Sequence, residues 1–150
     1  MKHIILLRHA SAVHDHAGGD FNRPLSSHGI TQVQTVAHAF LGRGLHPELA
    51  LASPAMRTRQ TAELLAKHLS KLDIITDHAL YLATGNRMLD ILMSMPDDIQ
   101  TLLLVGHNPG ISELAANLDN QRSVEQLPTA GFVACQLRIH RWRDIPKTTK

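Results

Sequence analysis

The sequence of 150 residues is poor in aromatic side chains, which make up only 3% of it. Few rings are therefore available to stack on nucleic-acid bases. The charges nearly balance, because 15 lysine and arginine residues face 13 aspartate and glutamate residues for a formal net charge of +2. Apart from a basic stretch at residues 138–143, the positive side chains are scattered along the chain. This composition argues against nucleic acid as a partner.

Cysteine is almost absent, since Cys135 is the only one. This excludes an intramolecular disulfide and any zinc site that needs several thiolates, and it fits a reducing compartment. The apolar run at residues 4–7 is interrupted by Arg8 and is shorter than the roughly 7 to 15 apolar residues of a signal peptide. No run reaches transmembrane length. The sequence therefore predicts a cytoplasmic protein without a membrane partner.

Short apolar runs alternate with segments of helical periodicity along the chain. This alternation is typical of a mostly parallel sheet with helices on both faces. We therefore expect a single α/β domain over residues 1–150, with three α/β/α layers and an antiparallel edge strand. The expected strands are residues 3–8, 49–52, 74–76, 101–105 and 132–139, and the expected helices are residues 27–41, 54–69, 86–95 and 111–118.

Basic side chains follow three of the expected strands. Arg8 and His9 come at the end of the first, Arg57 follows the second, and His107 follows the strand at residues 101–105. The carboxyl ends of parallel strands are where open α/β proteins build their sites. We therefore expect these side chains to converge on one anion pocket. Ser53 is expected to cap the helix that begins at Pro54.

These residue types suit phosphoryl transfer. A neutral imidazole can attack phosphorus in line and form a phosphohistidine that water then hydrolyses, and His9 is the candidate nucleophile. Arg8 and Arg57 can present planar donor forks to phosphate oxygens. We expect their charges to lower the pKa of His9 below about 6.5. His107 is expected to donate to the same oxygens, near the N-terminus of a helix.

Each of these residues also has an ordinary structural interpretation. Arg8 and His9 could cap a strand, Arg57 could be a solvated helix residue, and His107 could be a hydrogen-bonded turn histidine. Taken alone, each residue indicates a catalytic role no more strongly than a structural one. Their ordered combination favours the pocket.

The longest irregular segment is the polar stretch at residues 10–26. A loop of this length near a site is more often functional than accidental. Its His14, Asp15 and His16 belong to residue types that bind metals, but no thiolate or helical histidine pair supports a metal centre. We therefore expect neither a metal nor a cofactor. Arg23 either reaches the substrate phosphate from this loop or only anchors the loop.

Three ordered motifs resemble the histidine phosphatase superfamily, which has the phosphoglycerate mutase-like fold. They are Arg8-His9, Ser53-Pro54-x-x-Arg57-x-x-x-Thr61-Ala62 and Gly106-His107-Asn108-Pro109. The small size and two further segments, Arg23-Pro24-Leu25-Ser26-x-x-Gly29 and Leu80-Tyr81-Leu82-Ala83, narrow the resemblance to the SixA-like phosphohistidine phosphatases. The resemblance implies a metal-independent phosphatase. Ala10 departs from the glycine usual in the family, and alanine fits there only if the backbone does not need a positive φ.

The region at residues 80–82 carries no carboxylic acid, although many members of the superfamily place one there to protonate a departing alkoxide. Asp77 and Asp90 are off the expected position. Proton donation contributes roughly 10² to 10⁴-fold in rate for such a leaving group. The lack of this carboxylic acid matters less for a phosphohistidine substrate, because the leaving imidazole can be protonated on its own ring. We therefore expect a substrate protein that carries phosphohistidine, in a signalling or phosphotransfer role, with poor use of aryl phosphates and hardly any use of serine or sugar phosphates.

Two alternatives remain open at the level of the sequence. The first is a non-catalytic phosphate-recognition module, against which an intact His9 argues. The second is a small-molecule phosphomonoesterase of the same superfamily. With 150 residues, the chain has little room for the inserted elements with which larger relatives surround small substrates. We expect the protein to be a monomer.

Overall fold

A five-stranded sheet forms the middle layer of the computed structural model, which describes residues 1–118 and 126–146. The strands are β1 (Lys2–Arg8), β2 (Leu49–Ala52), β3 (Asp73–Thr76), β4 (Thr101–Gly106) and β5 (Phe132–Leu137). Their spatial order is β3-β2-β4-β1-β5. The pairs β2–β3, β2–β4 and β1–β4 are parallel, whereas β5 runs antiparallel to β1 at one edge. The expected mixed sheet with an antiparallel edge strand is confirmed.

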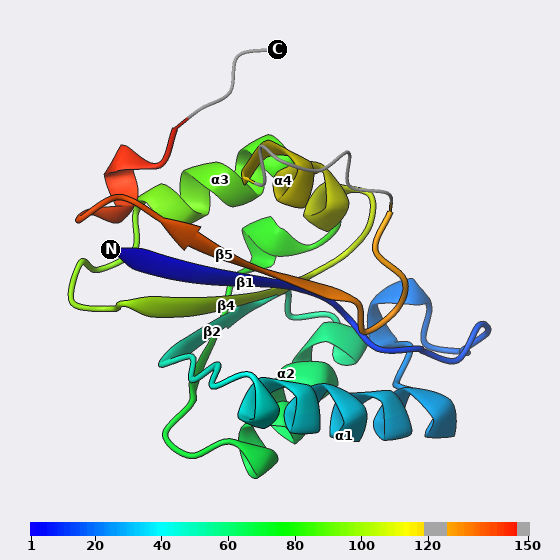
Figure 1. Ribbon diagram of the computed structural model, residues 1–150. Helices are drawn as coiled ribbons and strands as arrows, with labels where there is room; N and C mark the ends of the chain where they lie inside the picture. The colour runs from blue at the N-terminus through cyan, green and yellow to red at the C-terminus, as the bar shows by residue number, and fades with distance from the viewer. Residues whose placement is uncertain (119–125, 147–150) are drawn as a thin grey trace.

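Four α-helices cover the two faces of the sheet (Figure 1). Helices α1 (Ser27–Gly42) and α2 (Met56–His68) pack on one face, and α3 (Gly85–Met93) and α4 (Gly110–Leu118) pack on the other. Short 3₁₀ helices lie at η1 (Asp20–Asn22), η2 (His78–Leu80) and η3 (Trp142–Asp144). The three α/β/α layers predicted from the sequence are therefore present. No described helix is both long and apolar enough to span a membrane.

Strand β1 separates two hydrophobic cores because its side chains alternate between the faces of the sheet. Ile4 and Leu6 pack with the α3 and α4 side of the protein. Ile5 and Leu7 pack with α1 and α2. All four of these side chains are at most 1% exposed. Such burial on both faces explains why the strand reads as a continuous apolar run.

The carboxyl ends of three parallel strands lie level with one another. Arg8 at the end of β1 pairs in register with Gly106 of β4, and Ala52 at the end of β2 pairs with Val105. The residues that follow these strands therefore emerge at one edge of the sheet. This register brings the segments after Arg8, Ala52 and Gly106 together, although they are far apart in the chain.

Three boundaries differ from the expectation by two residues. Helix α2 begins at Met56 and its N-cap position is Ala55, which makes no side-chain cap, so Ser53 does not cap a helix from Pro54. Strand β5 ends at Leu137 and helix α3 ends at Met93, each two residues before its predicted end. The Ser53 hydroxyl contacts both the Ala55 amide and the ring of His107.

The loop after β1 is fixed against the start of α1. Ser26, the N-cap of α1, accepts a hydrogen bond from the Gly29 amide and donates one to the Ser11 carbonyl at 3.1 Å. A Cβ atom at Gly29 would lie 2.0 Å from that carbonyl oxygen. Only glycine therefore permits this close approach.

Candidate active site

His9 is the first residue after β1, and its backbone continues the hydrogen bonding of that strand to its neighbours. Its amide donates to the Gly106 carbonyl and its carbonyl accepts from the Ala130 amide. The side chain is 8% exposed. Its Nδ1 donates to the Ala10 carbonyl at 2.8 Å, because a carbonyl can only accept. In the neutral ring, Nε2 therefore carries the lone pair that a nucleophile needs.

Ala10 occupies the position where the family usually has glycine. It is fully buried, and it is not among the residues of positive φ in the described chain. Its methyl group is therefore accommodated without backbone strain. The departure from the family pattern does not disturb the geometry of His9.

His107 follows β4 and lies beside His9, with 5.5 Å between the ring centroids. The ring is 2% exposed. Its Nδ1 accepts a hydrogen bond from Arg57 at 3.2 Å, and its Nε2 therefore carries the proton and donates to the Ser53 hydroxyl at 2.9 Å. Both ring nitrogens are thus engaged with protein groups.

Arg57 projects from the first turn of α2 and is 3% exposed. Its guanidinium donates to the Asp20 carbonyl at 2.9 Å, to the Asp20 carboxylate at 3.2 Å and to His107. Its Nε is buried without a partner. A buried guanidinium with an unused donor is suited to bind an anion.

Arg8 and Arg23 complete the basic groups around the site. Arg8 donates from Nη1 to the Leu127 carbonyl at 3.0 Å, while its Nε is buried without a partner, and burial lowers the pKa of its guanidinium. Arg23 donates from Nε to the Asp20 carboxylate at 3.0 Å and from Nη1 to the Val13 carbonyl at 2.9 Å. Arg23 thus anchors the loop and also belongs to the site network.

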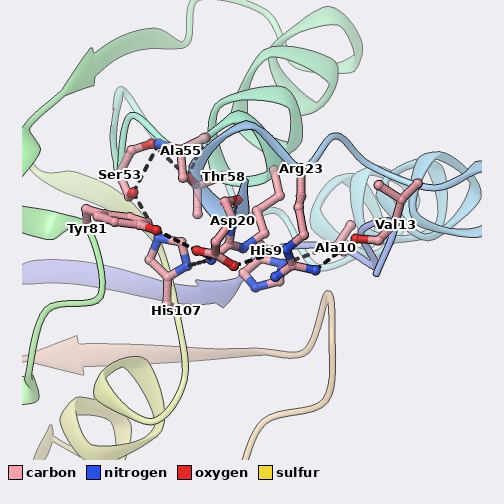
Figure 2. A network of polar contacts seen from close by, with 11 residues as sticks. His9, Ala10, Val13, Asp20, Arg23, Ser53, Ala55, Thr58, Tyr81 and His107 are labelled. Carbon is pink, nitrogen blue, oxygen red and sulfur yellow. Dashed lines mark hydrogen bonds and ion pairs between the residues drawn. The ribbon is translucent and has the colours of Figure 1, made fainter. Parts of the chain in front are cut away.

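Asp20 belongs to the candidate site, although sequence reasoning gave it no role. One carboxylate oxygen accepts from Arg23, and the other accepts from Arg57 and from the Tyr81 hydroxyl (Figure 2). The Tyr81 bond is the largest cause that lowers the pKa of Asp20 to about 2, and Arg57 and Arg23 act in the same direction. The bond to Asp20 in turn raises the pKa of Tyr81. The spacing Asp20-x-x-Arg23 was the one local signal for this ion pair, because residues three apart can meet within one helical turn.

Both site histidines are neutral near pH 7. Burial is the largest cause that lowers the pKa of His9 to about 4, and the charges of Arg57, Arg8 and Arg23 lower it further against the opposing Ala10 hydrogen bond. Burial and then Arg57 lower the pKa of His107 to about 3. The predicted direction is therefore right for His9, but burial contributes more than the guanidiniums that the sequence suggested.

The arrangement can bind an anion and attack it. Two guanidiniums and a phenol donate hydrogen bonds to the Asp20 carboxylate. The same donors suit the oxygens of a phosphate group. A neutral histidine with Nε2 unprotonated lies next to these donors. This combination meets the needs of nucleophilic phosphoryl transfer.

Metal-ligating residues do not cluster in the described chain. Within residues 1–118 and 126–146, no group of three or more histidine, cysteine, aspartate or glutamate residues could hold a metal ion. His14, Asp15 and His16 are exposed, and Nδ1 of His16 accepts a hydrogen bond from the Gly18 amide. Asp77 caps η2 by accepting from the Ala79 amide.

A separate hollow of about 360 Å³ lies at the other end of the sheet, against His3, Thr101 and Cys135. None of the described residues that line it is an arginine or a lysine. Its lining therefore offers no guanidinium or ammonium group to a phosphate, in contrast to the residues around His9.

Comparisons with known proteins agree with this geometry. Residues 4–81 match the family model of the histidine phosphatase superfamily (branch 1). An uncharacterized protein of Mycobacterium tuberculosis is 30% identical over 93% of this chain and 91% of its own length. A solved structure from Agrobacterium tumefaciens, described as a phosphohistidine phosphatase SixA, is similar with a TM-score of 0.81 and 27% identity over 89% of this chain and 90% of that one.

A mycobacterial glucosyl-3-phosphoglycerate phosphatase has the same fold, with a TM-score of 0.71 and 16% identity over 97% of this chain and 95% of that one. The fold is thus shared by phosphatases with different substrates. The family model, the relative of 30% identity and the SixA-like structure confirm the resemblance that the three motifs indicated. The chain belongs to the histidine phosphatase superfamily.

Proposed function

We propose that this protein is a phosphatase that removes phosphate from phosphohistidine on a signalling or phosphotransfer protein, with His9 as its nucleophile. The observation that carries the proposal is the hydrogen bond from Nδ1 of His9 to the Ala10 carbonyl. It leaves Nε2 with a lone pair, next to the buried guanidinium of Arg57. Membership of the histidine phosphatase superfamily supports the phosphatase activity itself.

In the proposed first step, Nε2 of His9 attacks phosphorus in line. The new N–P bond forms as the bond to the leaving nitrogen of the substrate breaks, and that imidazole leaves with its own ring proton. In the second step, water attacks the phosphohistidine and releases inorganic phosphate, which restores neutral His9. Arg8, Arg57 and Arg23 are proposed to neutralise the phosphoryl oxygens in both steps.

His107 is proposed to stabilise the same oxygens. Its Nδ1 accepts from Arg57, so this nitrogen can donate to a phosphate oxygen only after it takes a proton. An incoming phosphate dianion favours that protonation, because a negative charge raises the pKa of a nearby histidine. The charge of the substrate would thus create the donor that binds it.

The ionisation of the Asp20 carboxyl group supports the preference for phosphohistidine. Asp20 is ionised in the free protein, since its pKa is about 2. In the free protein it therefore carries no proton that it could give to a departing alkoxide. An imidazole leaving group needs no such donor from the enzyme, and its conjugate acid has a pKa of about 6.5.

A phosphohistidine-bearing protein is the proposed partner, the enzyme acts as a monomer without metal or cofactor, and one domain spans residues 1–150. A cytoplasmic location fits the single cysteine, because cytoplasmic thiols stay reduced.

A small-molecule phosphatase is the second candidate. It is favoured by the shared fold with the mycobacterial glucosyl-3-phosphoglycerate phosphatase. The discriminating experiment compares kcat/KM for a phosphohistidine protein, p-nitrophenyl phosphate, a phosphoserine peptide and a sugar phosphate, each with and without EDTA. We expect the phosphohistidine protein to be used best and EDTA to have no effect.

Three outcomes of that comparison contradict the proposal. A sugar phosphate or phosphoserine peptide that equals the phosphohistidine protein favours the second candidate. If EDTA abolishes the activity and zinc restores it, the result supports a metal site at His14, Asp15 and His16. Binding of the phosphoprotein without any release of phosphate identifies a recognition module.

A further inference from the structure

Thr61 joins the helix that carries Arg57 to the segment that carries His9. Its side chain is 1% exposed, in the second turn of α2. Its hydroxyl donates to the Arg57 carbonyl at 2.7 Å and accepts from the Ala10 amide at 3.1 Å. A hydroxyl has one proton, so the bond to Arg57 uses its donor and leaves its lone pairs for Ala10.

The backbone of Ala10 is held at both of its polar groups. Its amide donates to Thr61, and its carbonyl accepts from Nδ1 of His9 at 2.8 Å. Ala10 is fully buried, so water does not replace a lost partner of its amide unless the segment opens. A shift at the amide therefore moves the carbonyl that determines which nitrogen of His9 carries the proton.

We propose that Thr61 is a positioning residue that fixes the Ala10 carbonyl and, through it, the Nδ1–H tautomer and the direction of Nε2 of His9. The inference rests on the proposed role of His9 as the nucleophile. The opposite tautomer has its proton on Nε2 and no lone pair to attack phosphorus. The same hydroxyl fixes the spacing between the nucleophile and the helix that supplies Arg57.

A threonine hydroxyl bonded to the carbonyl four residues earlier is by itself an ordinary helical feature. Thr31 and Thr35 of α1 make such bonds at 3.3 Å on an exposed face. The bond to Ala10 is what distinguishes Thr61. Thr35→Val is therefore a matched control, because it removes a hydroxyl with the same helical bond far from the site.

The experiment compares the wild-type protein with Thr61→Val, Thr61→Ser and Thr35→Val. Valine keeps the shape of threonine without the hydroxyl, and serine keeps the hydroxyl. Proton–nitrogen correlation NMR of the His9 ring, in the free protein near neutral pH, reports the tautomer. We expect Nδ1–H alone in the wild type, Thr61→Ser and Thr35→Val, and mainly Nε2–H in Thr61→Val.

Steady-state kinetics with p-nitrophenyl phosphate give the second readout. We expect kcat of Thr61→Val to fall by about tenfold or more while KM changes by less than about threefold, because the loss is in the nucleophile and not in the binding of phosphate. Thr61→Ser should restore kcat to within about threefold of the wild-type value. Thr35→Val should match the wild type.

An unshifted His9 tautomer in Thr61→Val overturns the proposal, whatever its activity. Should Thr61→Val fail to fold, Thr61→Ala removes the hydroxyl with less bulk and is judged by the same criterion. A shifted tautomer with both kcat and kcat/KM unchanged supports the role of Thr61 but refutes His9 as the nucleophile. The failure of this proposal is therefore distinguishable from the failure of the proposed function.

Discussion

The carboxylate of Asp20 lies 3.2 Å from the Arg57 guanidinium and acts as its counterion inside the protein. Arg57 is 3% exposed, whereas the Asp20 side chain is 48% exposed. The buried arginine is thus neutralised by a carboxylate that belongs to a surface loop. A phosphate group that binds Arg57 has to compete with this carboxylate.

This competition predicts the effect of Asp20→Asn. The amide keeps the size of the side chain but removes its charge, so Arg57 and Arg23 lose the carboxylate with which they pair. Inorganic phosphate should then inhibit at a concentration several times lower than for the wild type. Asp15→Asn, on an exposed carboxylate of the same loop, should leave the inhibition constant unchanged. Weaker inhibition in Asp20→Asn would indicate that the carboxylate orients the arginines and does not compete for them.

Arg57→Ala should reduce kcat/KM by roughly 100-fold, or about 3 kcal/mol, because one charge-stabilising donor to the phosphoryl group is lost. Arg59→Ala provides the control. Arg59 lies on the exposed side of the same helix and pairs with Glu63 at 3.4 Å. An Arg57→Ala enzyme with the kcat/KM of Arg59→Ala would place Arg57 outside the reaction.

Much of the fold was predictable from the sequence because the information is local. The apolar runs and helical periodicity give the strands and helices to within a few residues, and the two-sided burial of β1 reads directly as an uninterrupted run. The spatial order of the strands was not predictable in this way. It depends on pairings between segments far apart in the chain, such as β1 with β4.

The site shows the same division between local and distant information. Ser53 has the local sequence of a helix cap, but its partner His107 lies 54 residues further along the chain and determines where its hydroxyl points. Asp20 looked like one of several polar loop residues, because its partners Arg57 and Tyr81 are 37 and 61 residues away. The burial that controls the pKa of His9 likewise exists only in the folded protein.

The neutral histidines predict an acid-dependent loss of stability. The pKa of His9 falls to about 4 and that of His107 to about 3 on folding, from an ordinary value of 6.5. The unfolded chain therefore binds protons first as the pH drops, and the stabilisation that is present above about pH 6.5 is lost toward pH 4 for His9 and pH 3 for His107. Asp20 does not contribute in the upper part of this window, because its pKa moves from 3.8 to about 2.

The free energy of unfolding in urea, measured at about pH 7 and about pH 5, tests this expectation. Each neutral buried histidine should account for roughly 2 kcal/mol of the decrease. The decrease should therefore be smaller by that amount in His9→Ala, which we expect to fold because His9 lies at a strand end and adds little to the core. Equal decreases in the two proteins would show that His9 is protonated in the native state near pH 5.

The covalent role of His9 is tested most directly by trapping the phosphoenzyme. The protein is exposed briefly to a labelled phosphodonor, quenched under alkaline conditions, and examined for acid-labile phosphate by mass spectrometry of its peptides. The account predicts one acid-labile phosphate on His9 of the wild-type protein and none on His9→Ala, which should still show the circular dichroism of the folded protein. Turnover of the phosphodonor by His9→Ala near the wild-type rate, or a label on another residue alone, would contradict it.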